Sequence, residues 1–231
     1  MDLGLEDKVA IVGGASKGIG RACAMVLGQE KAKLALCSRN GGVLEQTAKD
    51  IREATSAEVL TIPGDLYEYE TVKKLVSQAA DRFGRIDILV NNTGGPPPGR
   101  AQDTDEEAWN IGIQGTLLYF VRMCREALPY LRQQGGGRII NILSTTVKDP
   151  IYNLVLSNSL RMGVVGFAKN LADEVAKDNI LINNVCPGSI LTDRLRSLVA
   201  NNAKASGRTV EELLEENAAR IPIGRIGQPE E

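Results

Sequence analysis

Short apolar runs alternate along the chain with longer stretches in which apolar residues recur every three or four positions. The runs are typical of buried strands, and the longer stretches are typical of helices with one buried face. The alternation predicts an α/β fold in which parallel strands are joined by right-handed helical crossovers. The six predicted strands are Val9–Val12, Lys33–Ser38, Glu58–Ile62, Ile86–Asn91, Arg138–Leu143 and Ile180–Val185.

The clearest helix is predicted between the third and fourth strands, where six apolar residues share one face. These residues are Val72, Leu75, Val76, Ala79, Ala80 and Phe83. Two longer helices are predicted at Asp105–Leu131 and Leu154–Lys177. The first of them should present apolar surface from Trp109, Leu117, Leu118 and Phe120. Surplus apolar area on these helices would suit a subunit interface.

The size and charge of the chain fit one metabolic domain that spans residues 1–231. The formal net charge of −2 gives no reason to expect nucleic acid or an anionic membrane as a partner. No apolar stretch is as long as a membrane span, and the segment Met1–Asp7 lacks the basic and apolar regions of a signal peptide. We therefore expect a cytoplasmic protein.

The chain contains no histidine, and its four cysteines are widely separated. It therefore lacks the Cys/His clusters that are typical of zinc sites, and no metal site is predicted. Without imidazole, Ser-His-Asp triads and histidine-based dehydrogenase chemistry are excluded. The cysteines, interpreted as small buried hydrophobic residues, are Cys23, Cys37, Cys124 and Cys186.

A glycine-rich segment follows the first predicted strand and reads Gly13-Gly14-Ala15-Ser16-Lys17-Gly18-Ile19-Gly20. Glycines let the backbone approach a pyrophosphate closely. A helix that begins near Gly18 would add unpaired N–H groups and the positive end of its dipole. The segment therefore predicts a phosphate-binding turn.

The end of the second predicted strand indicates which dinucleotide is bound. An acidic residue at this point usually selects NAD, whereas the 2′-phosphate of NADP requires cations. The strand ends in Cys37-Ser38-Arg39-Asn40, which contains no acid. Arg39 offers a planar set of donors, and Lys17 could approach the same phosphate from the glycine turn. We therefore expect NADP rather than NAD; the alternative is that both cations are solvated surface residues.

Five motifs follow one another in order, each at the carboxyl end of a predicted strand. They are Gly14-x-x-x-Gly18-x-Gly20, Asp65, Asn91-Asn92-Thr93-Gly94, Ser144 and Pro187-Gly188-x-x-x-Thr192. With these motifs the chain resembles, from Lys8 to Glu230, the classical short-chain dehydrogenase/reductase family, and within it the β-ketoacyl-carrier-protein reductases. The resemblance implies a Rossmann-type doubly wound sheet of strand order 3-2-1-4-5-6. Family members usually continue past the position of Glu231, so we expect a seventh strand to be missing.

The resemblance also implies a set of cofactor contacts. Asp65 and Leu66 would flank the adenine, Asn91 and Gly94 would pack beside the adenosine half, and Ile190 and Thr192 would hold the nicotinamide carboxamide. The remaining residues of this predicted site are Gly14, Ser16, Lys17, Gly18, Ile19, Gly20, Arg39, Arg161, Pro187 and Gly188. Asn91 and Asn92 have an alternative role, as strand-end residues whose amides satisfy loop backbone groups. A homodimer or homotetramer built on the two long helices is implied as well.

The catalytic positions of the family are only partly kept. A serine orients the substrate oxygen, a tyrosine exchanges its proton, a lysine lowers the tyrosine pKa, and an asparagine holds a water relay. Ser144 matches the serine, but Ser157 and Arg161 stand where tyrosine and lysine belong, and Gly112 stands at the asparagine position. Arg161 would still bind the nicotinamide ribose. Ser157 is a poor substitute acid, because an aliphatic hydroxyl ionises far less readily than a phenol.

Tyr152 is the nearest candidate to replace the missing phenol, because the segment between Ser144 and Ser157 would overhang the nicotinamide. Lys148 is a second possible donor. The alternative is that Tyr152 packs in a substrate loop and Lys148 is a solvated charge. The sequence thus predicts an NADP(H)-dependent oxidoreductase for a small carbonyl or alcohol, with altered acid/base groups. The alternative function is a non-catalytic NADP-binding regulatory or structural subunit.

Overall fold

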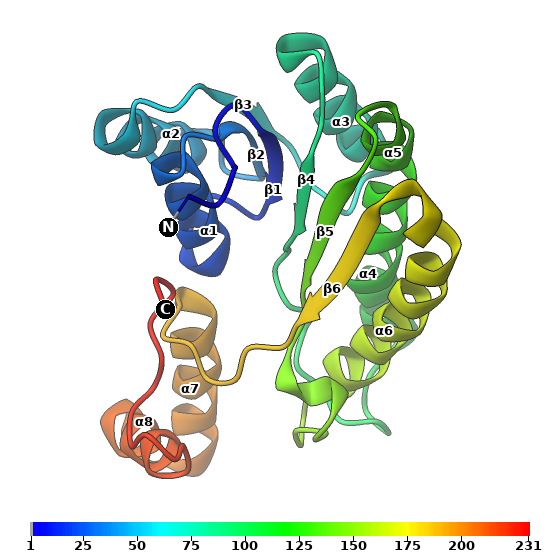
Figure 1. Cartoon of the computed structure of the whole chain (residues 1–231). Coiled ribbons are helices and arrows are strands. Elements are labelled where there is room, and N and C mark those ends of the chain that lie inside the picture. The colour runs from blue at the N-terminus through cyan, green and yellow to red at the C-terminus, as the bar shows by residue number, and fades with distance from the viewer. Residues whose placement is uncertain (1) are drawn as a thin grey trace.

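A six-stranded parallel sheet forms the centre of the molecule, in the order β3-β2-β1-β4-β5-β6 (Figure 1). The computed structural model describes residues 2–231. The strands are β1 (Val9–Gly13), β2 (Lys33–Ser38), β3 (Val59–Pro63), β4 (Ile88–Asn91), β5 (Gly137–Ile142) and β6 (Ile180–Val185). All six predicted strands and the doubly wound order are therefore confirmed.

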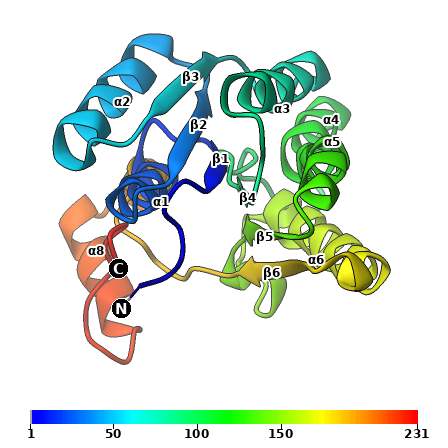
Figure 2. The ribbon, with the colours of Figure 1, turned by 45° about the horizontal axis from the view of Figure 1, so that its top comes forward.

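Helices cover both faces of the sheet (Figure 2). The helices α1 and α2 lie on one face, and α3, α5 and α6 lie on the other. The bounds are α1 (Gly18–Gln29), α2 (Gly41–Thr55), α3 (Tyr69–Phe83), α4 (Glu106–Gly112), α5 (Tyr119–Gln133), α6 (Val155–Val175), α7 (Asp193–Ser206) and α8 (Val210–Ala219). A helix thus follows each of the first five strands, as right-handed crossovers between parallel strands require.

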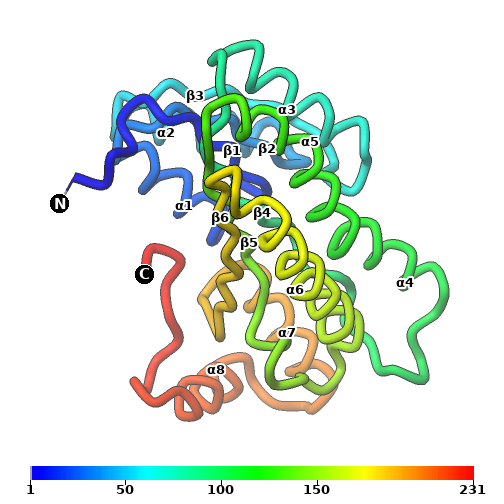
Figure 3. The backbone as a smooth tube through the Cα atoms, turned by 45° about the vertical axis from the view of Figure 1, so that its right-hand side comes forward, coloured from blue at the N-terminus to red at the C-terminus, as the bar shows by residue number. Residues whose placement is uncertain are grey.

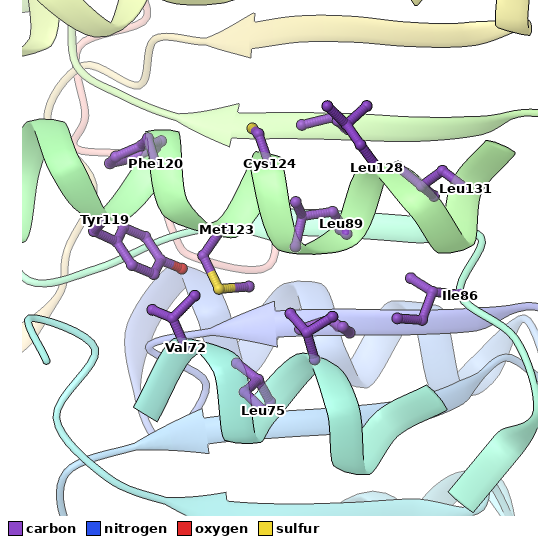
Figure 4. Close-up of a cluster of buried hydrophobic side chains, with 14 of the residues drawn as sticks. Val72, Leu75, Ile86, Leu89, Tyr119, Phe120, Met123, Cys124, Leu128 and Leu131 are labelled. Carbon is purple, nitrogen blue, oxygen red and sulfur yellow. The ribbon is translucent and has the colours of Figure 1, made fainter. Parts of the chain in front are cut away.

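The larger hydrophobic core lies between the sheet and the helices α3 and α5 (Figure 4). Val72 and Leu75 of α3 point toward Leu89 of β4 and Met123 of α5, and all four side chains are inaccessible to water. The apolar face predicted for α3 is therefore confirmed. Burial of this kind contributes about 1.5–3 kcal/mol for each large aliphatic side chain.

The predicted helix at Asp105–Leu131 is present but is not continuous. The helix α4 begins after Asp105, whose carboxylate accepts a hydrogen bond from Ala108 N at 2.8 Å. A π-helical turn, Ile113–Leu118, separates α4 from α5. Phe120 supplies apolar surface to the core and is fully buried, so it is not part of the surplus apolar area expected at a subunit interface. Such π-turns insert one residue per turn and are not visible in a 3.6-residue periodicity.

After β6 the chain crosses the carboxyl edge of the sheet and forms α7 and α8 (Figure 3). The C-terminal tail returns to this connection, where Ile190 pairs with Gly227. On the edge strand β6, the side chains of Leu181 and Val185 are each 46% exposed. Among residues 2–231, no helix has both the length and the apolar character needed to cross a membrane.

Candidate cofactor-binding and active site

The glycine-rich turn between β1 and α1 is held by the amide of Asn92. Its Nδ2 donates to the carbonyl oxygens of Gly13, at 3.1 Å, and Gly14, at 3.4 Å. A Cβ atom on Gly14 or Gly20 would lie 2.7 Å from that nitrogen, so neither position has room for a side chain. The tight backbone leaves the N-terminus of α1 open to a phosphate, as the glycine pattern predicts. The alternative role predicted for Asn92, an amide that satisfies loop backbone groups, is therefore confirmed.

The carboxyl ends of β2, β3 and β4 carry the residues predicted for the adenosine half of a cofactor. Arg39 is exposed at the end of β2, and among residues 2–231 no carboxylate pairs with it. Asp65 follows β3 and accepts a hydrogen bond from Tyr67 N at 3.0 Å, while Leu66 beside it is buried. Gly94 is exposed at the start of the loop after β4. An exposed cation without a counter-ion at the end of β2 fits a 2′-phosphate.

Asn91 lies below this surface rather than on it. It is fully buried, and its Nδ2 donates to Asn141 Oδ1 of β5 at 2.9 Å. Asn141 in turn donates to Asn184 Oδ1 of β6 at 2.9 Å, so three amides link neighbouring strands. The Oδ1 atom of Asn91 is buried and has no hydrogen-bond partner within residues 2–231. Because its Nδ2 bonds side chains, Asn91 does not fill the alternative role of satisfying loop backbone groups.

The loop from β6 to α7 faces the glycine turn across a pocket of about 320 Å³. Ser16, Lys17 and Gly18 line one side, and Leu191 and Thr192 line the other. The methyl group of Thr192 would lie 3.0 Å from a Cβ on Gly18. The predicted residues Pro187, Gly188 and Ile190 belong to the same loop. The structure therefore brings the first and last motifs of the predicted site together.

Lys17 is already engaged in an ion pair at the mouth of this pocket. Its Nζ lies 2.9 Å from Asp193 Oδ2, and both side chains are well exposed. An exposed pair of this kind contributes little to stability, so it does not prevent Lys17 from turning toward a phosphate. Of the two cations predicted to bind the 2′-phosphate, only Arg39 is without an acidic partner in the described chain.

Ser144, Ser157 and Arg161 form a polar cluster with Thr146 at the carboxyl end of β5. Ser144 Oγ accepts a hydrogen bond from Thr146 N at 3.2 Å. Ser157 Oγ lies 3.3 Å from Thr146 Oγ1 and accepts a hydrogen bond from Arg161 Nε at 3.2 Å. A second donor of Arg161 bonds the Ile142 carbonyl at 3.1 Å. Three of the four predicted catalytic residues therefore lie in one network, in which Arg161 bonds Ser157 directly and Ser144 is joined to Ser157 through Thr146.

Arg161 is a buried cation with no carboxylate beside it. It is 7% exposed, and none of the ion pairs within residues 2–231 involves it. Burial lowers the pKa of Arg161 to about 10, and the positive charge of Arg194 acts in the same direction. At neutral pH the group keeps its proton and remains a fixed positive charge at the base of the site.

Gly112, at the position of the family's relay asparagine, is packed against leucine side chains. A Cβ atom on Gly112 would lie 2.9 Å from Leu160 Cδ1 and 3.4 Å from Leu156 Cδ1, both on α6. An asparagine at this position would therefore require the ends of both leucine side chains to shift.

Tyr152 lies away from this cluster. Its side chain is 78% exposed, and the guanidinium carbon of Arg100 stands 5.9 Å from the centre of its ring. No protein group within residues 2–231 hydrogen-bonds its phenol. Lys148 is exposed as well. A general acid needs a positioned hydrogen bond, which Tyr152 lacks in this conformation.

Two side chains near the site were not predicted. The ring of Tyr67 packs directly against Gly115 of the π-turn, where a Cβ atom would lie 2.1 Å from it. Desolvation raises the pKa of Tyr67, although the positive charge of Arg39 opposes that effect. Arg194, in the first turn of α7, donates to the Pro96 carbonyl at 2.6 Å and so bridges α7 to the loop after β4. Neither residue belongs to a motif, and their proximity depends on the loops.

Comparisons with known proteins agree with this geometry. Residues 8–203 match the family described as short chain dehydrogenase. The 3-oxoacyl-[acyl-carrier-protein] reductase of Vibrio cholerae is 30% identical over 99% of this chain and 88% of its own length. The crystal structure of L-sorbose reductase from Gluconobacter frateurii with NADPH and L-sorbose superposes with a TM-score of 0.94, at 32% identity over 100% and 88% of the two chains. The crystal structure of actinorhodin polyketide ketoreductase with NADPH superposes with a TM-score of 0.92, at 33% identity over 97% of this chain and 86% of the other.

Proposed function

The chain belongs to the short chain dehydrogenase family, and from that premise we propose that it is an NADP(H)-dependent oxidoreductase for a carbonyl/alcohol pair. The residues present fit the cofactor. The glycine turn leaves room for a diphosphate at the N-terminus of α1, and Arg39 supplies an unpaired cation for the 2′-phosphate. NADP(H) held by these residues would supply the hydride chemistry that interconverts a carbonyl and an alcohol.

The observation that carries this proposal is the hydrogen-bonded cluster of Ser144, Thr146, Ser157 and Arg161, at the same edge of the sheet as the glycine turn. Because Thr146 N–H donates to Ser144 Oγ, the Ser144 hydroxyl proton is free to bind a carbonyl oxygen. Ser157 differs, since its oxygen accepts from Arg161 and its hydroxyl group shares a hydrogen bond with Thr146 Oγ1. The Ser144 donor, together with the positive charge of Arg161, would stabilise the negative charge that develops on the substrate oxygen.

The acid/base step differs from that of the family's usual tyrosine. Arg161 holds its proton, so it acts on Ser157 and on the oxygen through charge and hydrogen bonding. The proton comes from water, or from Tyr152 if the segment that carries it closes over the substrate. Loss of a positioned general acid costs about 10² to 10⁴ in rate, whereas proximity and orientation are retained. We therefore expect slow turnover.

A non-catalytic NADP-binding subunit is the second candidate. Ser157 and Gly112 favour this second candidate, because they replace the tyrosine and the asparagine through which the family transfers protons. The two candidates share cofactor binding and differ only in turnover. An enzyme oxidises NADPH when it is offered ketones, 3-oxoacyl thioesters or ketose sugars, and a binding subunit does not.

Matched serine variants test the enzyme assignment. We expect Ser144→Ala to lower kcat by at least ten-fold, because a donor to the reacting oxygen is removed. NADPH affinity should stay within about two-fold of the parent value, since Ser144 is not assigned to the cofactor. Ser159→Ala, on the exposed side of the same helix as Ser157, is the control and should leave kcat unchanged. Equal activity in Ser144→Ala and Ser159→Ala would contradict the assignment.

We also propose that the chain forms a homodimer or homotetramer through α4, α5 and α6. Ile111 on α4 and Met162 on α6 are 40% and 50% exposed, and these two helices contact each other. An isologous interface would cover such apolar side chains on both subunits. Sedimentation at micromolar concentration tests this proposal, and a monomer would contradict it.

A further inference from the structure

We propose that Thr146 is a positioning residue, which turns the hydroxyl proton of Ser157 away from the protein so that Ser157 holds the water that protonates the reacting oxygen. The inference rests on the proposed function, because it requires a carbonyl substrate beside Ser144. It goes further by naming the source of the proton and the residues that orient it.

The direction of the hydrogen bond between Arg161 and Ser157 is fixed by chemistry. A guanidinium carries donors only, so Arg161 Nε donates to Ser157 Oγ across 3.2 Å. A second donor of Arg161 bonds the Ile142 carbonyl at 3.1 Å and holds the guanidinium in place. The Ser157 oxygen therefore accepts one bond already, and its own proton has to point elsewhere.

The hydrogen bond between Thr146 and Ser157 has two possible directions, and burial decides between them. Their hydroxyl oxygens are 3.3 Å apart. Thr146 is 2% exposed, and Ser157 Oγ is the single acceptor that its hydroxyl has within residues 2–231. If Ser157 donated this bond, the Thr146 proton would be buried without an acceptor, which is costly. Ser157 is 8% exposed, so its own proton can be turned toward water instead.

With Thr146 as the donor, one residue prepares both serines. Its N–H occupies the oxygen of Ser144 at 3.2 Å, and its O–H occupies the oxygen of Ser157. Among residues 2–231, no other protein acceptor is in reach of the Ser157 hydroxyl. Each serine then keeps its own proton free for the substrate side of the cluster.

The length of the serine side chain explains why a water is needed. A tyrosine at position 157 would extend further by an aromatic ring, so Ser157 reaches an oxygen bound at Ser144 through a bridging water. As the carbonyl carbon takes up the hydride, its oxygen takes a proton from this water. The hydroxide that remains accepts the Ser157 hydrogen bond and is stabilised by the charge of Arg161 until solvent protonates it.

Thr146→Val tests the role of Thr146, because it removes the hydroxyl and keeps the shape of the side chain. We expect kcat to fall by about 3- to 10-fold, as for the loss of one hydrogen bond, while KM and NADPH affinity stay within about two-fold of the parent values. Thr146→Ser keeps the donor and should retain kcat. Ser157→Ala should lower kcat at least as far as Thr146→Val, and combining the two changes should lower it no further.

A matched variant and a direct measurement complete the test. Thr116→Val is the control, because Thr116 is a fully buried threonine whose hydroxyl has no partner within residues 2–231. It should leave kcat unchanged, and the thermal midpoint of each variant shows whether the fold is intact. Neutron diffraction from deuterated crystals of the parent locates the hydroxyl deuterons without any need for turnover. We expect the Thr146 deuteron to lie between the two oxygens and the Ser157 deuteron to point away from Thr146.

The proposal is overturned if a folded Thr146→Val protein turns over as fast as the parent, or faster, because a Thr146 that accepts the bond would withhold the Ser157 proton. It is also overturned if Thr146→Val slows the Ser157→Ala variant as strongly as it slows the parent, which would show a purely structural effect. A Ser157 deuteron on the line to Thr146 would overturn it as well. A parent protein that reduces no ketone, 3-oxoacyl thioester or ketose would overturn the proposed function together with this inference.

Discussion

Gly115→Ala is expected to destabilise the protein, although alanine normally stabilises a helix. The new Cβ would lie 2.1 Å from two atoms of the Tyr67 ring. The ring cannot slide aside easily, because Arg122 donates to Tyr67 O at 3.0 Å and fixes the backbone. Expelling a half-buried tyrosine ring exposes on the order of 100 Å² of surface, which costs about 2.5 kcal/mol. The gain in helix propensity is about 1 kcal/mol.

The net loss is therefore about 1.5 kcal/mol, or a fall of about 3–6 °C in Tm for a chain of this length. Thermal unfolding followed by circular dichroism measures it. The matched control is Gly42→Ala in α2, where the nearest atom, Asn40 Oδ1, is 3.6 Å from the new Cβ. That variant should be neutral or up to about 1 kcal/mol more stable. If Gly115→Ala destabilises equally when Tyr67 is already replaced by serine, the clash is not the cause and the reasoning is refuted.

Three further variants test other parts of the site and fold. Arg39→Asp should weaken the binding of NADPH by about 10- to 100-fold and erase or reverse the preference of the protein for NADPH over NADH, because the 2′-phosphate then faces an acid. Equal affinities of the parent protein for the two cofactors, measured by calorimetry, would contradict the assignment of NADP. Tyr152→Phe should abolish turnover and Ser157→Ala should have little effect if Tyr152 supplies the proton, whereas undiminished turnover in Tyr152→Phe assigns the proton to Lys148 or water. Although burial opposes it, the bonds from Arg85 and Val9 hold the pKa of Asp87 below its usual range. The stability that this carboxylate contributes is present above its unfolded pKa of about 4 and is lost as pH falls through the lower folded pKa. Asp87→Asn should therefore lower the free energy of unfolding at pH 7 by about 1–3 kcal/mol and flatten its fall at acid pH. An unchanged fall at acid pH would contradict this explanation.

The strands and the glycine turn were predictable because each depends on local sequence. A buried parallel strand is apolar along its length, and Val9–Gly13 and Lys33–Ser38 show this directly. The turn that follows β1 needs glycines for close backbone contacts, so its position is fixed by residue type alone. The order of motifs along the chain then places each one at the same edge of the sheet.

The contacts that were missed depend on loops and on side-chain geometry. The sequence offered loop backbone groups as partners of the Asn92 amide, but it did not show that these groups belong to Gly13 and Gly14, 79 and 78 positions away. Arg194 meets Pro96 although 98 positions separate them. Tyr152 illustrates the opposite case, because its sequence position suggested a role above the nicotinamide while its ring lies in solvent. The orientation of a loop side chain is set by tertiary packing, which periodicity does not encode.

Transfer of deuterium from NADPH labelled at the nicotinamide C4 position tests the central claim most directly. The protein is incubated with the labelled cofactor and a panel of ketones, 3-oxoacyl thioesters and ketose sugars, and the products are analysed by mass spectrometry. We predict an alcohol that carries one deuterium on the former carbonyl carbon, formed more slowly in Ser144→Ala than in Ser159→Ala. Tight binding of NADPH with no labelled product from any substrate would contradict the account and identify a non-catalytic nucleotide-binding subunit.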